Sequence, residues 1–152
     1  MKTYRRRAWI FGILTLLIMG FIFSQSFQPA AESDEESLSL VQMVIRFLDP
    51  NGRFTESQWN GFIRKAAHFA EFAALGLCVA GMTAAMGELH RCRYRSLPLL
   101  ICLLTAVCDE TIQTFIPGRA GMPADVMLDF VGTAFGVAVC LGLFFRTRRR
   151  KY

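Results

Sequence analysis

Residues 62–86 read FIRKAAHFAEFAALGLCVAGMTAAM, an apolar stretch whose charged and histidine side chains are confined to its beginning. A helix of about 20 such residues crosses a bilayer core about 30 Å thick. An isolated strand in lipid would leave its backbone groups unpaired. The stretch therefore predicts a transmembrane helix that carries polar residues near one end.

Three further segments, at 9–27, 97–115 and 126–145, have the same apolar character. Together with 62–86 they predict an all-α integral membrane protein, a four-helix bundle that forms a single domain over residues 1–152. The first segment has the positive start of a signal peptide, but its apolar run exceeds the roughly 7–15 residues usual there. No good small-x-small cleavage site follows it, so we expect it to be retained as a helix.

Arginine clusters predict the orientation of the chain. They lie at residues 5–7, 91–95 and 146–151, each beside an apolar segment, in a chain of net charge +5. Cytoplasmic loops are enriched in Lys and Arg, so both termini and the loop 87–96 are predicted to be cytoplasmic, in a multi-pass protein of the cell membrane. The same distribution argues against a nucleic-acid partner. It indicates contact with the lipid bilayer and its anionic headgroups.

The long outer segment between the first two spans contains one more helical pattern. Leu38, Val41, Ile45 and Leu48 recur at helical spacing within 37–48, after an acidic run at 32–36. The pattern predicts a short amphipathic helix that lies on the outer membrane surface or covers the end of the bundle. It should end at the turn sequence DPNG, residues 49–52.

Polar residues inside the spans gather in the outer halves of the helices. Charged residues there cost roughly 2.5–3.5 kcal/mol each at a helix centre, so they usually face a bundle interior or cavity. Helical spacing puts them on shared faces, and Gly132 and Gly136 follow on the face of the last span, where they permit close helix packing. The predicted polar site comprises Arg64, Lys65, His68, Glu71, Asp109, Glu110, Gln113, Arg119, Asp125 and Asp129.

Three interpretations of this site remain open from the residues alone. The polar side chains can act only as contacts between helices, with Glu71 paired to Arg64 or Arg119 and His68 hydrogen-bonded to Asp109. They can bind an anionic envelope component through Arg64, Lys65 and Arg119. They can also catalyse a reaction on a lipid-linked phosphate, although no phosphate loop or nucleophile motif is present.

No cofactor and no metal are predicted. His68 with Asp109, Glu110 and Asp125 offers a possible set of ligands for a divalent metal, but one histidine among carboxylates is a weak pattern. The oligomeric state is not predicted.

The motifs at these positions resemble the VanZ-like family of small membrane proteins. They are FSQ at 23–25, RKxxHFxEF at 64–72, DExxQxFxPGR at 109–119 and DVxxDxxG at 125–132. Two positions depart from the pattern: Phe72 stands where tyrosine is common, and Asp129 where many members have asparagine. The resemblance implies a multi-pass cell-envelope protein associated with reduced susceptibility to teicoplanin and related glycopeptides. An anionic envelope lipid precursor or a lipoglycopeptide is then the expected partner.

Overall fold

The computed structural model describes residues 2–49, 51–90 and 96–149, and these residues form five helices without a strand. The helices are α1 (Lys2–Ser26), α2 (Ala30–Leu48), α3 (Glu56–His90), α4 (Leu97–Gln113) and α5 (Pro123–Arg149). The predicted all-helical class is confirmed. The arginine-rich loop 91–95 and the end 150–152, which carry part of the orientation argument, lie outside the described residues.

Three of the described helices are long and apolar enough to cross a membrane. They are Lys2–Ser26, Glu56–Gly87 and Pro123–Leu143. The fourth predicted span corresponds to α4, which is shorter, at 17 residues. At 1.5 Å per residue it is about 26 Å long, slightly less than the bilayer core of about 30 Å.

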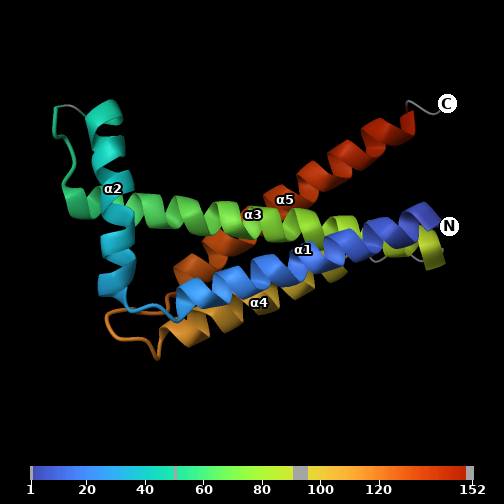
Figure 1. Ribbon diagram of the computed structural model, residues 1–152, viewed down its shortest axis with the longest axis horizontal. Helices are drawn as coiled ribbons and strands as arrows, with labels where there is room; N and C mark the ends of the chain where they lie inside the picture. The colour runs from blue at the N-terminus through green and yellow to red at the C-terminus, as the bar shows by residue number, and fades with distance from the viewer. Residues whose placement is uncertain (1, 50, 91–95, 150–152) are drawn as a thin grey trace.

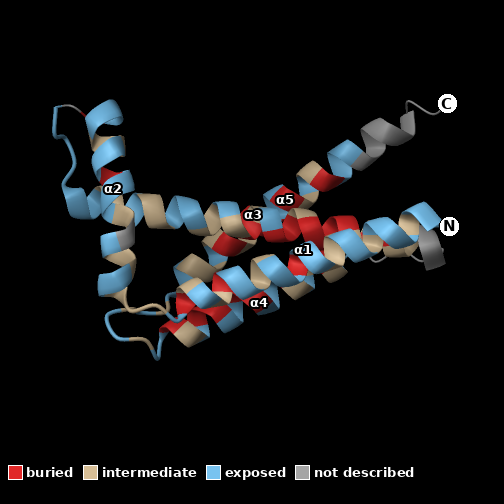
Figure 2. Cartoon of the chain, viewed as in Figure 1, coloured by how far each residue is buried: buried red, intermediate tan, exposed pale blue. Residues whose placement is uncertain are grey.

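The long helices meet around a small apolar core. Figure 1 shows α1, α3 and α4 running together, while α5 crosses α3 and then diverges from it. The buried residues lie where these helices meet, and much of α1 is exposed (Figure 2). Leu16 and Leu17 of α1, for example, are 69% and 64% exposed. Such an apolar exposed surface is compatible with a lipid environment. The core cluster is Ile22, Phe72, Leu75, Val79, Cys102 and Ala106.

The amphipathic helix is longer than predicted. α2 begins at Ala30 instead of residue 37, so the acidic run forms its first turns. It lies across one end of the bundle against α3 (Figure 1), with Val41 fully buried. Its start is fixed to the loop between α4 and α5, because the Ala30 N–H donates to the Pro117 carbonyl (3.3 Å). Acidic side chains suit a helix amino terminus, which explains the extension.

Asp49 closes the turn between α2 and α3. Its carboxylate accepts hydrogen bonds from the N–H groups of Arg53 and Phe54 (2.8 Å each) and from the Trp59 indole (3.2 Å). These bonds, the one from Arg53 first, favour the ionised form and lower the pKa of Asp49 below its usual range. The turn is therefore stabilised by an ionised carboxylate.

We expect this turn to loosen in acid. A lowered pKa means that the contribution is complete above the unfolded value of about 3.9 and is lost as the pH falls through the folded value. Trp59 fluorescence, recorded in a Trp9→Phe background, should change below about pH 4. Asp49→Asn should remove this transition. If wild type and Asp49→Asn give the same acid profile, Asp49 does not stabilise the turn through its charge.

Candidate functional site

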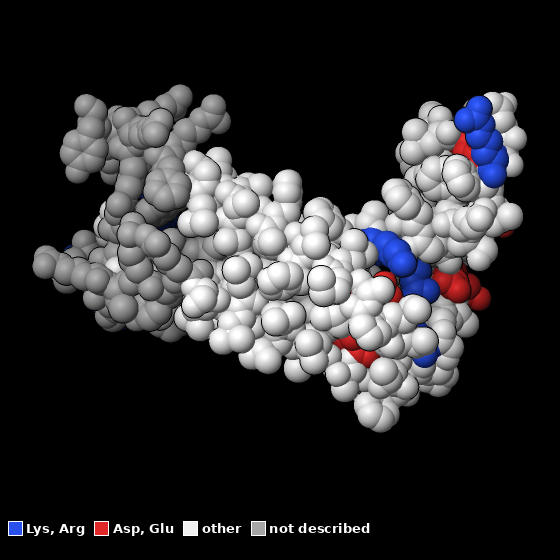
Figure 3. Space-filling model, turned by 180° about the vertical axis from the view of Figure 1, so that it is seen from behind, with Lys and Arg blue, Asp and Glu red and all other residues white. Residues whose placement is uncertain are grey.

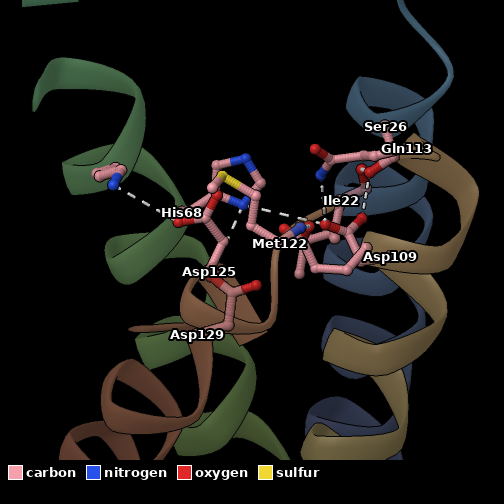
Figure 4. A network of polar contacts seen from close by, with 10 residues as sticks. Ile22, Ser26, His68, Asp109, Gln113, Met122, Asp125 and Asp129 are labelled. Atoms are coloured by element: carbon pink, nitrogen blue, oxygen red, sulfur yellow. Dashed lines mark hydrogen bonds and ion pairs between the residues drawn. The ribbon is translucent and has the colours of Figure 1, made fainter. Parts of the chain in front are cut away.

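Three ionisable side chains from three helices meet near the α2 end of the bundle. His68 of α3 lies between Asp109 of α4 and Asp129 of α5 (Figure 4). Its Nδ1 is 3.7 Å from Asp129 Oδ1 and 4.0 Å from Asp109 Oδ2. Both carboxylate side chains are completely buried, and His68 is 23% exposed. We call these three residues the buried triad.

Close packing of α3 and α5 brings the buried triad together. Gly132 and Gly136 of α5 lie directly against the α3 backbone, where an added Cβ at Gly132 would be 2.5 Å from the Phe69 carbonyl oxygen. An added Cβ at Gly136 would overlap the Ala73 carbonyl oxygen. His68 precedes Phe69, and Asp129 lies nearly one turn before Gly132. The glycines therefore bring the backbones close enough for these two side chains to face each other.

Asp109 is held by two neutral hydrogen-bond donors. Ser26 at the end of α1 donates to its Oδ1, and Gln113 Nε2 donates to its Oδ2 over 2.9 Å. Ser26 is 1% exposed and Gln113 6%. Since i and i+4 share a helix face, the sequence predicts Gln113 beside Asp109, but it does not predict Ser26 there. The two donors fix the orientation of the carboxylate toward His68.

Asp129 has a different environment. Neither of its carboxylate oxygens has a hydrogen-bond donor among the described residues, and the same is true of His68 Nδ1. Thr133, one turn further along α5, is completely buried, and its side chain lies beside that of Cys102. The 4.0 Å separation of His68 and Asp109 is too long for a hydrogen bond, so the suggested bond between them is wrong.

The remaining carboxylates of α4 and α5 contact the loop and α3 instead of joining the buried triad. Glu110 Oε2 accepts the Met122 N–H (2.8 Å), and Asp125 lies 3.6 Å from Lys65 Nζ. Adjacent residues of a helix point about 100° apart, so Glu110 faces away from the side of α4 that carries Asp109. The metal-ligand set suggested by the sequence, which included Glu110 and Asp125, is therefore not brought together.

The two arginines of the site differ in their partners. Arg64 Nη1 lies 3.3 Å from Asp34 Oδ1 of α2, and Asn60 donates to the same oxygen. Arg119 has no ion pair or side-chain hydrogen bond with any described residue, and its Nε is buried. Burial and then the charge of Arg64 lower the pKa of Arg119, although a guanidinium remains charged at neutral pH. The site thus contains a free, partly desolvated cation.

Glu71 is half-buried on α3 and forms no hydrogen bond or ion pair with a described residue. The suggested pairing with Arg64 or Arg119 is not found, because Arg64 reaches Asp34 on α2.

Figure 3 shows that charged side chains gather toward the end of the molecule that holds α2, while the broad middle has none on that face.

Sequence reasoning missed Ser26, Thr133 and Asp34, which lie with the residues of the predicted polar site; we call this whole set the polar cluster. Thr133 follows Asp129 by four residues, so helical spacing was a usable signal. Ser26 had a weaker signal, because its neighbours Ser24 and Gln25 are equally polar. Ser24 instead donates to the Phe21 carbonyl of its own helix (2.7 Å). Asp34 had none, since its contact depends on how α2 lies on α3.

The family model described as VanZ/LLP1 matches residues 11–146, which is nearly the whole chain. No curated protein and no solved structure matches it.

Proposed function

The chain belongs to the VanZ/LLP1 family, and from this premise we propose that it is a cell-membrane protein whose outward-facing polar cluster binds an anionic envelope component. Candidates for this ligand are the headgroup of a lipid-linked precursor and a lipoglycopeptide. Binding would lower susceptibility to glycopeptides such as teicoplanin. The proposal names a binding role and assigns no reaction.

The observation that carries the proposal is the free guanidinium of Arg119. Asp109, Asp34 and Glu110 act on this partly buried cation electrostatically but form no direct ion pair with it, so its nitrogens are available to an incoming anion. A guanidinium offers a planar fork that matches a phosphate or carboxylate through two parallel hydrogen bonds. Gly118, with a φ of 77°, forms the turn that presents this side chain.

The proposed topology has four spans, with α4 as the fourth and both termini in the cytoplasm. Two observations support it. α1 begins and α5 ends at the end of the molecule away from α2 (Figure 1). Arg5, Arg6 and Arg7 lie in the first turns of α1, where cytoplasmic arginines are common. This arrangement leaves Arg119 and α2 on the outer side, where envelope precursors and glycopeptides are found.

The first test is the teicoplanin susceptibility of a sensitive host that produces the chain, compared with the same host carrying an empty vector. Membrane abundance is measured by immunoblot in parallel. We expect the producing host to grow at higher teicoplanin concentrations. Equal susceptibility of the two hosts would reject the protective role and leave the fold and the family unchanged.

Glu71→Gln separates a working site from contacts that only hold helices together. Because Glu71 has no partner to lose, the variant should unfold at the same temperature as wild type or a higher one. A charge within a span costs roughly 2.5–3.5 kcal/mol at the helix centre, and the amide removes it. We expect the protection against teicoplanin to fall while the membrane abundance of the variant stays equal to that of wild type. A loss of protection that merely follows a loss of abundance would favour the purely structural interpretation.

A further inference from the structure

The buried triad has the composition of a metal site. Its three donors are an imidazole nitrogen and two carboxylate oxygens, each from a different helix (Figure 4). One ligand atom from each residue lies within 4.8 Å of the others. We propose that His68, Asp109 and Asp129 bind a divalent transition-metal ion between α3, α4 and α5. This inference does not depend on the anion-binding role proposed above.

The unpartnered atoms are the independent observation that points to an ion. Both oxygens of Asp129 and the Nδ1 of His68 are buried without a hydrogen-bond partner among the described residues, and Asp129 is 0% exposed. Buried carboxylates are normally hydrogen-bonded, paired or bound to metal. A cation at the centre of the buried triad satisfies the atoms that protein donors leave unsatisfied.

Charge supports a divalent ion. Metal ligands bind in their deprotonated forms, so two carboxylates and a neutral imidazole would present a net charge of about −2 to the ion, which one M²⁺ neutralises. None of the nearby cations forms an ion pair with a triad carboxylate among the described residues: Arg64 pairs with Asp34, Lys65 pairs with Asp125, and Arg119 forms no ion pair.

The donor set selects among metals. Imidazole suits Zn²⁺ and other transition metals, whereas Mg²⁺ and Ca²⁺ prefer oxygen ligands alone. Zinc binds nitrogen and oxygen at about 2.0–2.2 Å, which places tetrahedral ligands about 3.3 Å apart. The two distances to His68, 3.7 Å and 4.0 Å, would have to shorten by about 0.4 and 0.7 Å. No two ligand atoms of the triad are more than 4.8 Å apart, so the third distance would shorten by at most about 1.5 Å. Three protein ligands leave a fourth position open.

Asp109 already has the support that a metal ligand needs. Ser26 and Gln113 donate to its two oxygens and fix the direction of the carboxylate. Loss of such a supporting hydrogen bond typically weakens metal binding by about 10- to 100-fold. Three variants therefore differ in their expected effect: His68→Gln and Asp129→Asn each remove a metal ligand, whereas Ser26→Ala removes only a hydrogen bond that orients Asp109.

The test uses the full chain in detergent micelles, freed of metal with a chelator and titrated with zinc chloride alone. We expect uptake of one zinc ion per chain and a higher melting temperature with zinc. His68→Gln and Asp129→Asn should each lose stoichiometric uptake, and Ser26→Ala should keep it with affinity lowered about 10- to 100-fold. Circular dichroism checks that each variant is folded.

Two variants serve as controls. Glu56→Gln removes an exposed carboxylate of α3, and Cys108→Ala removes an exposed thiol that can bind zinc by itself. Both should behave as wild type. Wild type that takes up no stoichiometric zinc overturns the inference, whatever the variants do. So does uptake by folded His68→Gln and Asp129→Asn chains that equals wild type. Because no glycopeptide or lipid is present, neither result bears on the anion-binding proposal.

Discussion

Replacement of Arg119 by lysine is expected to remove most of the protection against teicoplanin without lowering membrane abundance. Lysine keeps the positive charge but loses the planar fork that grips an anion through two hydrogen bonds. Hydrogen bonds to charged groups contribute about 1.5–3 kcal/mol, so the loss of one corresponds to roughly 10- to 100-fold weaker binding. The loss of protein stability should be small, because the guanidinium forms no ion pair or side-chain hydrogen bond with a described residue.

The measurement has two parts. Protection is compared between hosts that produce wild type, Arg119→Lys and Arg119→Ala at matched abundance. The purified chains are then titrated separately with teicoplanin and with inorganic pyrophosphate, which stands for the headgroup of a lipid-linked precursor. Arg46→Lys, at the far end of α2, is the control for an arginine outside the polar cluster. Full protection from Arg119→Lys would show that charge alone is enough and would remove the bidentate contact from the proposal.

The apolar pattern of the sequence was sufficient for the helical class but not for the helix ends. α3 spans 56–90 instead of the predicted 62–86. Hydropathy marks the part of a helix that is apolar, whereas the helix itself continues through polar turns as long as its backbone hydrogen bonds are satisfied. Thr55 and Gln58 show how: the Gln58 side chain accepts the Thr55 N–H and the Thr55 hydroxyl accepts the Gln58 N–H, in a reciprocal cap ahead of Glu56. The spacing of Thr55 and Gln58 is a sequence signal for this earlier helix start.

The partners of the polar residues were less predictable than the residues themselves. His68, Asp109 and Asp129 were all among the predicted polar residues, because each stands out against an apolar helix. Which atoms meet depends on how the helices cross and rotate, and one sequence does not contain that information. Arg64 illustrates the limit. Its partner Asp34 belongs to α2, whose position across the bundle has no signal in the periodicity of either helix.

Gly136→Ala is expected to have the largest effect on stability. A Cβ at this position would overlap the carbonyl oxygen of Ala73 and lie 2.9 Å from the Leu77 nitrogen. Both atoms belong to the α3 backbone and cannot rotate away, so α3 and α5 must separate. Overpacking of this kind typically costs about 1–3 kcal/mol, and contact with backbone places Gly136 toward the upper end. Thermal unfolding in detergent micelles, followed by circular dichroism, measures the loss.

Gly142→Ala is the matched control on the same helix, because an added Cβ there meets no atom within 4 Å. Alanine is the better helix former by up to about 1 kcal/mol, so this variant should be neutral or more stable. The two variants together test the packing of α5 on α3, since both replace a glycine of α5 by alanine but only Gly136 faces the α3 backbone. Separation of α3 from α5 would also move His68 away from Asp129, so folded Gly136→Ala should bind zinc more weakly than Gly142→Ala. Equal stability of the two variants would mean that α3 and α5 do not pack at Gly136, and the buried triad would then lose the contact that brings its side chains together.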